Sequence, residues 1–181
     1  MLDKINRYER KWLYRTNDHL TLINCLIRSN FFFNTQYSNR RVNSIYFDNS
    51  NYSSIRQNLD GVSEKQKIRV RWYGKQKQLM NPILEIKSKK GMVTKKEIYK
   101  IKELEGLKFP DLNNLELIKN VINSKNISKN TIWPILTTNY DRQYFISNNG
   151  KVRATVDHNL HSINLKNLSQ IEIVKNFSFM C

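Results

Sequence analysis

Cationic residues on segments with a β-strand pattern, most of them spaced two or four positions apart, are the groups in this sequence best suited to bind or activate a ligand. The pairs are Arg7 with Lys11, Arg69 with Arg71, and Lys87 with Lys89, and single arginines follow at Arg142 and Arg153. Residues two apart on a strand project from the same side, so each pair adds two positive charges to one face. The planar guanidinium of arginine donates two hydrogen bonds to one phosphate group. The pattern therefore favours the binding of phosphate groups.

The same pattern has an ordinary structural interpretation, which is an antiparallel sheet with one face exposed to water. Two observations favour anion binding instead. Few carboxylates lie among the outward residues of these segments. Like charges that face one another on neighbouring strands are also unfavourable unless an anion lies between them. We therefore expect a curled or closed sheet whose concave face collects the cations.

Hydrophobic periodicity predicts an α+β fold in which strands position these cations. Strands are predicted at residues 5–15, 42–48, 67–74, 83–91, 93–101, 132–146 and 151–157, and helices at 18–28, 52–59 and 115–122. In the third of these strands Val70 and Trp72 alternate with Arg69 and Arg71, which is typical of a strand with one buried face. A turn signal at Gly91 joins the fourth and fifth strands in a hairpin. We therefore expect an antiparallel sheet.

Composition limits the class of protein. The 181 residues include 31 Lys or Arg and 15 Asp or Glu, which gives a net charge of +16 and favours a polyanion or an anionic surface as the partner. The length fits one domain, and no run approaches the roughly 20 apolar residues that a membrane helix needs. The N-terminal segment lacks the pattern of a secretory signal, and two cysteines are too few for a disulfide framework. A cytoplasmic location is therefore expected.

Other common catalytic and binding chemistries are less well supported. His158 and His161 lie three residues apart without a third zinc ligand nearby, so we expect solvent-exposed loop histidines. Cys25 lies among leucines and isoleucines, which predicts a buried apolar side chain. The five glycines are scattered and form no phosphate-binding loop. A nucleic-acid surface would interleave aromatic residues with cations, whereas Trp72 is predicted to face away from the arginines of its own strand.

Six short segments occur in an order that is more informative than any one of them. They are RYERKW, NSIYFD, KIRVRWYG, LEIKSKKG, NYDRQYF and VRATVDHNL, and together they extend over nearly the whole chain. In order and spacing they resemble the motif series of the VTC domain, the polyphosphate polymerase branch of the triphosphate tunnel metalloenzymes. The resemblance implies a single domain over residues 1–181, built as an antiparallel β-barrel or tunnel with peripheral helices. It also implies that ATP donates its terminal phosphoryl group to a polyphosphate chain, with a divalent metal, Mn²⁺ or Mg²⁺, as cofactor.

Carried to this chain position by position, the resemblance assigns roles to the cations described above. It makes Lys11, Arg69 and Arg71 the catalytic groups, which stabilise charge on the non-bridging phosphate oxygens. The implied phosphate ligands are Arg7, Lys11, Arg69, Arg71, Lys87, Lys95, Arg142 and Arg153. Lys95 and Lys96 both match the basic position of their hairpin, so the sequence leaves the choice between them open.

The chain departs from the family pattern near its C-terminal end. Glu9 and Glu85 match acidic positions and are the implied metal ligands, but the family's main metal glutamate lies on a later strand of the form Leu-Glu-Ile-Lys. The local candidate is Glu172 in QIEIVK, which lacks the lysine two places later. We therefore expect the family's last strand and closing helix to be absent. Such a barrel lacks one wall, and its sheet edges are open to another chain.

Three functions remain open from the sequence. The first is a metal-dependent polyphosphate polymerase that uses ATP. The second is a triphosphate hydrolase of the same architecture, which would have a glutamate where this chain has Arg7. The third is a noncatalytic module that binds polyphosphate, a nucleotide or an inositol phosphate. The resemblance favours the first, with ATP and polyphosphate as partners and no specific nucleic acid, and it leaves open the oligomeric state and association with a membrane protein.

Overall fold

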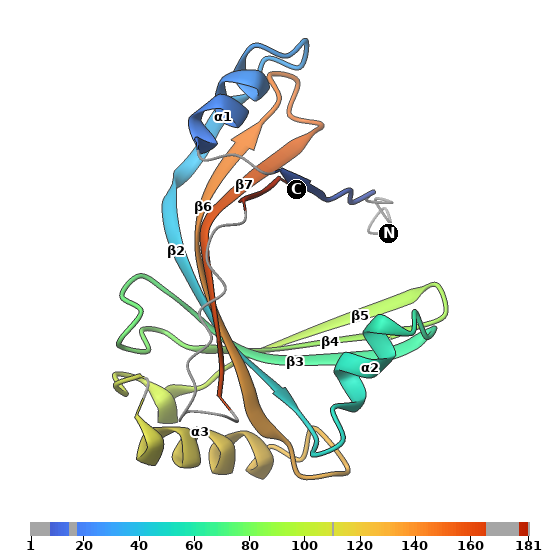
Figure 1. Cartoon of the computed structure of the whole chain (residues 1–181), viewed down its shortest axis with the longest axis vertical. Helices are drawn as coiled ribbons and strands as arrows, with labels where there is room; N and C mark the ends of the chain where they lie inside the picture. Colours follow the sequence, from blue (N-terminus) through green and yellow to red (C-terminus); the bar gives the residue numbers. More distant parts are fainter. Residues whose placement is uncertain (1–7, 15–17, 110, 166–177, 181) are drawn as a thin grey trace, which may run out of the picture. The chain divides into compact units, whose positions relative to one another are not determined.

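The structure is a computed structural model, which describes residues 8–14, 18–109, 111–165 and 178–180. Its elements (Figure 1) are β1 (Trp12–Tyr14), α1 (His19–Ile27), β2 (Asn34–Asp48), α2 (Ser53–Leu59), β3 (Glu64–Tyr73), β4 (Ile83–Lys90), β5 (Val93–Lys100), the 3₁₀ helix η1 (Lys102–Leu104), α3 (Leu112–Ser124), β6 (Trp133–Ile146), β7 (Arg153–Asn164) and β8 (Ser178–Met180). The chain divides into two compact units. In the described residues, unit 1 comprises residues up to 40, 140–160 and β8, and unit 2 comprises 41–139 and 161–165.

The strands are hydrogen-bonded in the order β1-β8-β7-β6-β2-β3-β4-β5. Antiparallel register joins β2 to β3, β3 to β4 and β4 to β5, and likewise β8 to both β1 and β7. Over the residues that the structure describes, this order starts at β1 and stops at β5 without closing into a barrel. The predicted α+β class, an antiparallel sheet with peripheral helices, is confirmed.

Most predicted elements are confirmed, but β2 and β7 are longer than expected. The strands predicted at 67–74, 83–91 and 93–101 correspond to β3, β4 and β5, and the three predicted helices correspond to α1, α2 and α3. β2 begins at Asn34 instead of residue 42, and β7 continues to Asn164 instead of ending at 157. Residues 34–40 are mostly exposed, so this part of β2 lacks the alternation of apolar and polar residues by which a half-buried strand is recognised.

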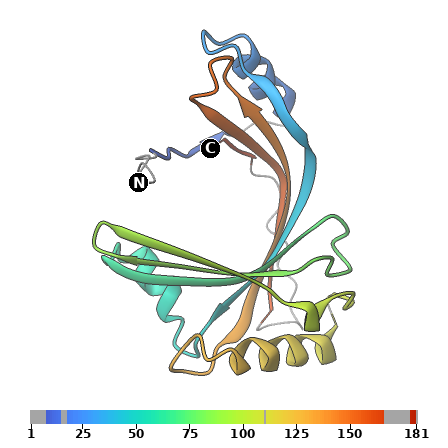
Figure 2. The same cartoon turned by 180° about the vertical axis from the view of Figure 1, so that it is seen from behind.

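Aspartate side chains accept hydrogen bonds at the N-terminal ends of the three described α-helices. Asp18, Asp48 and Asp111 each accept hydrogen bonds from backbone amides in the first turn of α1, α2 and α3, respectively. Asp48 is the last residue of β2, so its carboxylate ties α2 to the end of that strand. α2 lies beside β3, as both views show (Figures 1 and 2). None of the described helices is long and apolar enough to span a membrane.

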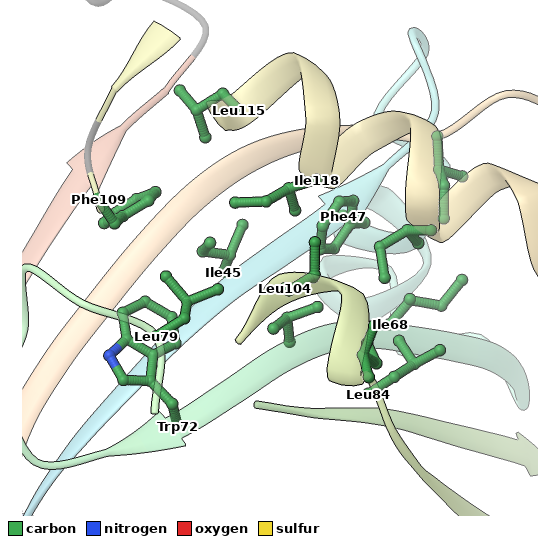
Figure 3. Close-up of a cluster of buried hydrophobic side chains, with 14 of the residues drawn as sticks. Ile45, Phe47, Ile68, Trp72, Leu79, Leu84, Leu104, Phe109, Leu115 and Ile118 are labelled. Carbon is green, nitrogen blue, oxygen red and sulfur yellow. The ribbon is translucent and has the colours of Figure 1, made fainter. Parts of the chain in front are cut away.

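The core of unit 2 lies between α3 and one face of β2, β3 and β4 (Figure 3). Its fully or almost fully buried side chains include Ile45, Phe47, Ile68, Val70, Trp72, Leu84, Ile118 and Ile122. The indole Nε1 of Trp72 donates a hydrogen bond to the carbonyl oxygen of Lys75 at 3.0 Å, so this buried polar group is satisfied. Because side chains alternate along a strand, the residues between these apolar ones point to the opposite face of the sheet.

A smaller core in unit 1 lies between α1 and the strands β6 and β7. It contains Leu22, Phe33, Phe145, Ala154 and Val156. The prediction that Cys25 is buried is wrong, because its side chain is exposed. Leu22 is the buried residue of α1, and Ile23 and Leu26 are partly buried against the same core. Ile27 is exposed like Cys25.

His158 is buried on β7, so the prediction of a solvent-exposed loop histidine is wrong. Its ring stacks on that of His19, with centroids 3.8 Å apart and an angle of 7° between the rings. Burial lowers the pKa of His158, and the neighbouring His19 lowers it further, whereas Asp141 and Asp157 act in the opposite direction. His161 also lies on β7 and is half-buried.

We expect protonation of His158 to destabilise the protein. Between its lowered folded-state pKa and the ordinary value of about 6.5, the unfolded state binds more protons than the folded state. The free energy of unfolding should therefore decrease as the pH falls from about 6.5 through the folded-state pKa. His158→Phe keeps a ring against His19 and removes the titrating group. The free energy of unfolding of this variant should therefore change less with pH over this range than that of the original chain. Urea unfolding at several pH values measures both slopes, and identical slopes would contradict the prediction.

Candidate anion-binding site

The strand register in unit 2 gathers the predicted basic residues of β3 and β4 on one face of the sheet. Arg69 lies directly opposite Tyr46 on β2 and Glu85 on β4. Arg71 lies opposite Ser44 on β2. Directly opposed residues of an antiparallel pair share a face, and the core residues occupy the other one. We call this surface the basic face, and its residues are Ser44, Tyr46, Lys67, Arg69, Arg71, Glu85, Lys87 and Lys96.

Three cations surround the carboxylate of Glu85 at the centre of the basic face. Oε2 of Glu85 accepts a hydrogen bond from Nε of Arg69 at 2.6 Å and lies 3.6 Å from Nη1 of Arg71. Oε1 lies 2.7 Å from Nζ of Lys96. Glu85 is only 4% exposed. The three cations and Glu85 together carry a net charge of +2. The buried carboxylate of Glu85 holds the three cations in place.

The pKa values of Glu85 and Arg69 are each shifted by opposing causes. Burial acts to raise the pKa of Glu85, but the hydrogen bond from Lys96 and the charges of Arg69 and Arg71 lower it below its ordinary value. Burial acts to lower the pKa of Arg69, and Tyr46 and Glu85 more than compensate, so that pKa is raised. Both groups therefore keep their charges at neutral pH.

Arg71 has an unused hydrogen-bond donor, whereas the corresponding donor of Arg69 is already engaged. Arg69 donates from Nε to Glu85 and from Nη1 to the hydroxyl of Tyr46, at 3.2 Å. Arg71 is also buried, yet its Nε has no hydrogen-bond partner among the described residues. A buried donor without an acceptor costs about 1–3 kcal/mol. A phosphate oxygen is an acceptor of the kind that this guanidinium lacks.

A row of lysines extends the basic face beyond the Glu85 cluster. Lys87 lies directly opposite Lys67 on β3 and Lys96 on β5. Lys95 lies opposite Ser88 on the other face, where its Nζ is 3.1 Å from a carboxylate oxygen of Glu97. The register therefore places Lys96, and not Lys95, on the basic face. Lys96 also pairs with Glu85, and the three lysines together add positive charge to the basic face beside that carboxylate.

Arg142 in unit 1 already has a carboxylate partner. Its Nε and Nη2 donate hydrogen bonds to Oδ1 and Oδ2 of Asp157, each at 2.6 Å. The guanidinium also lies 5.2 Å from the ring centroid of Tyr140. Burial acts to lower the pKa of Arg142, and the hydrogen bonds with Asp157 together with nearby charges raise it above its ordinary value. The two groups form a rigid bidentate pair.

The other predicted phosphate ligands of unit 1 are near the surface. Arg153 is exposed at the start of β7. Lys11 is exposed, and its Nζ lies 3.5 Å from a carboxylate oxygen of Glu9. Arg7 lies outside the described residues. The structure thus brings Arg69 and Arg71 together with Lys87 in unit 2, whereas Lys11, Arg142 and Arg153 belong to unit 1.

The carboxylates predicted to bind a divalent metal do not fit that role. Glu85 is surrounded by three cations, which repel a metal ion and occupy both carboxylate oxygens. Glu9 is paired with Lys11. Over the described part of the chain, no group of three or more His, Cys, Asp or Glu side chains could hold a metal ion. Glu172 lies outside the described residues.

Tyr46 is part of the site and was not among the predicted site residues, although it lies within the segment NSIYFD. Its hydroxyl accepts a hydrogen bond from Arg69, and its ring centroid lies 5.9 Å from the guanidinium carbon. The alternation of β2 could have placed Tyr46 on the side away from Ile45 and Phe47. Its pairing with Arg69 depends on the register of β2 with β3, which the pattern of either strand alone does not reveal.

Comparison with known proteins identifies a family and gives distant structural similarity. The family model for the VTC domain matches residues 6–180. No curated protein matches the chain. A solved structure from Hippeastrum, described as an adenylyl cyclase with a dominant triphosphatase activity, is 12% identical, with a TM-score of 0.46, and the alignment covers 94% of this chain and 74% of that one.

Proposed function

Because the chain belongs to the VTC domain family, we propose that it binds ATP and polyphosphate and transfers the terminal phosphoryl group of ATP to a polyphosphate chain. The observation that carries this proposal is the cluster of Arg69, Arg71 and Lys96 around the buried Glu85. The excess positive charge of this cluster and the lysine row beside it suit a ligand with several phosphate groups.

In the proposed reaction, a terminal oxygen of polyphosphate attacks the γ-phosphorus of ATP. A new phosphorus–oxygen bond forms, the bond between the γ-phosphorus and its bridging oxygen to the β-phosphate breaks, and ADP leaves. This chemistry needs positioning and charge stabilisation more than covalent help from the protein. Arg69 and Arg71 hold the non-bridging oxygens of the transferred group, and Glu85 and Tyr46 orient the Arg69 guanidinium in advance.

The family resemblance also assigns roles to residues of unit 1. Lys11 acts as a catalytic cation, and Arg7, Arg142 and Arg153 bind further phosphate groups of the chain. A divalent metal would neutralise phosphate charge when bound, but Glu9 and Glu85 are engaged with cations. The proposed reaction therefore uses no metal held by these two residues.

A noncatalytic phosphate-binding module is the second candidate function. The poor fit of Glu9 and Glu85 to a metal favours it, because a protein without the metal could still bind polyphosphate through its arginines and lysines. The two functions make the same use of Arg69 and Arg71 in binding and differ in whether ATP is consumed.

Product analysis distinguishes these functions. We expect the purified chain, incubated with ATP and Mn²⁺ or Mg²⁺, to release ADP and form polyphosphate in equal phosphoryl amounts, visible on a stained gel. Release of orthophosphate without polyphosphate would indicate a hydrolase. Binding of ATP or polyphosphate without any product would indicate the noncatalytic module. A chain that neither binds nor converts these compounds would contradict the proposal.

A further inference from the structure

A cluster of two tyrosines and one arginine lies in unit 1. The guanidinium carbon of Arg40 is 5.6 Å from the ring centroid of Tyr37 and 5.5 Å from that of Tyr144. The two tyrosine rings meet edge to face, with centroids 5.7 Å apart and an interplanar angle of 83°. We call these three residues the Tyr37 cluster. Aromatic rings combined with arginine are the side chains on which nucleobases stack.

The Tyr37 cluster is accessible to a ligand. Tyr37 is 47% exposed, Arg40 is exposed, and Tyr144 is half-buried. Tyr144 alternates along β6 with Phe145, which points into the core under α1. The cluster therefore lies on the side of the unit 1 sheet away from that core. Tyr37 and Arg40 therefore present surface that a ligand can reach.

The strand spacing connects the Tyr37 cluster to a predicted phosphate ligand of the same unit. Tyr144 and Arg142 are two residues apart on β6 and project from the same side, which separates them by about 7 Å along the strand. Tyr144 also contributes to raising the pKa of Arg142, so the two side chains are close enough to interact electrostatically. A nucleotide has the same order of chemical groups, with an aromatic base at one end and phosphates at the other.

We infer that the Tyr37 cluster stacks on the base of a nucleoside triphosphate whose phosphates lie toward Arg142. This inference rests on the proposed function and adds a base-binding position to it. The positive charge of Arg40 suits a polyanionic ligand and disfavours a cationic one. Stacking depends little on the identity of the base, so we expect ATP and GTP to bind similarly. A single nucleotide fits better than single-stranded nucleic acid, which needs successive aromatic platforms.

Isothermal titration calorimetry with ATP and with inorganic tripolyphosphate tests the inference, because tripolyphosphate has no base. Tyr37→Leu should weaken ATP binding by roughly 5- to 150-fold, the range for loss of one base-stacking contact, and leave tripolyphosphate binding unchanged. Tyr37→Phe keeps the ring and should retain the affinity of the original chain. Tyr99→Leu is the matched control, because Tyr99 is 48% exposed and lies on β5 in unit 2, outside the cluster.

The possible results separate this inference from the proposed function. If the original chain binds both ligands and Tyr37→Leu changes neither affinity, or lowers both equally, the base-binding position is wrong and the proposed function stands. If the original chain binds neither ligand, both proposals fail. An oligonucleotide without a terminal triphosphate that displaces ATP and binds more tightly would assign the cluster to nucleic acid and overturn the inference.

Discussion

Replacing Arg69 and Arg71 together by alanine is expected to abolish measurable triphosphate binding. The two guanidinium groups lie on adjacent same-side positions of β3 and share the buried carboxylate of Glu85. A hydrogen bond to a charged group contributes about 1.5–3 kcal/mol. Loss of one such bond from each arginine therefore weakens binding by roughly 10²- to 10⁴-fold. Calorimetry with tripolyphosphate measures this change directly.

Two controls separate loss of binding from loss of structure. The double variant leaves Glu85 buried with Lys96 as its remaining cation, so circular dichroism must accompany the calorimetry. Adding Glu85→Gln to the double variant removes the buried charge and should restore any lost stability without restoring binding. Lys75→Ala with Lys77→Ala removes the same net charge from an exposed loop and should leave affinity nearly unchanged. Equal weakening by the two double variants would mean that overall charge, not this site, attracts the ligand.

The alternation of β3 and β4 made much of the site predictable from sequence. Val70 and Trp72 are buried because one face of β3 packs against the core of unit 2, and the residues between them must then share the other face. The prediction that Arg69 and Arg71 point the same way is therefore confirmed. Periodicity of this kind is reliable wherever one side of a strand is buried and the other is polar.

The parts that sequence could not predict depend on pairing between strands. β5 is exposed along almost its whole length, so it has no apolar alternation that would assign Lys95 or Lys96 to the basic face. The exposed first half of β2, which contains Tyr37, is missing from the predicted strands for the same reason. The surroundings of Glu85 follow from its position opposite Arg69, and register is a property of two strands together.

Glu85→Gln is expected to destabilise unit 2 and to leave anion binding intact or stronger. The substitution keeps the size of the side chain and removes the counter-charge of three cations. Removing one partner of a buried ion pair typically costs about 3–5 kcal/mol, and we expect about 3 kcal/mol here because Lys96 is half-exposed. Glu97→Gln is the matched control on β5, where the exposed ion pair with Lys95 should contribute at most about 1 kcal/mol. Urea unfolding at neutral pH compares the three proteins.

The pH dependence of this difference follows from the lowered pKa of Glu85. A carboxylate with a depressed folded-state pKa stabilises the protein above its unfolded-state value of about 4.5, and that stabilisation is lost as the pH falls through the folded-state pKa. The stability difference between the original chain and Glu85→Gln should therefore shrink at acidic pH.

Binding in the presence of a chelator gives a second, independent readout of Glu85. The substitution raises the net charge of the cluster from +2 to +3 and removes a carboxylate that competes with the ligand for the arginines. Tripolyphosphate should then bind Glu85→Gln at least as tightly as it binds the original chain. The prediction would be wrong if Glu85→Gln bound tripolyphosphate more weakly than the original chain and Mn²⁺ strengthened binding only to the original chain. That result would mean that Glu85 holds a metal despite the cations around it.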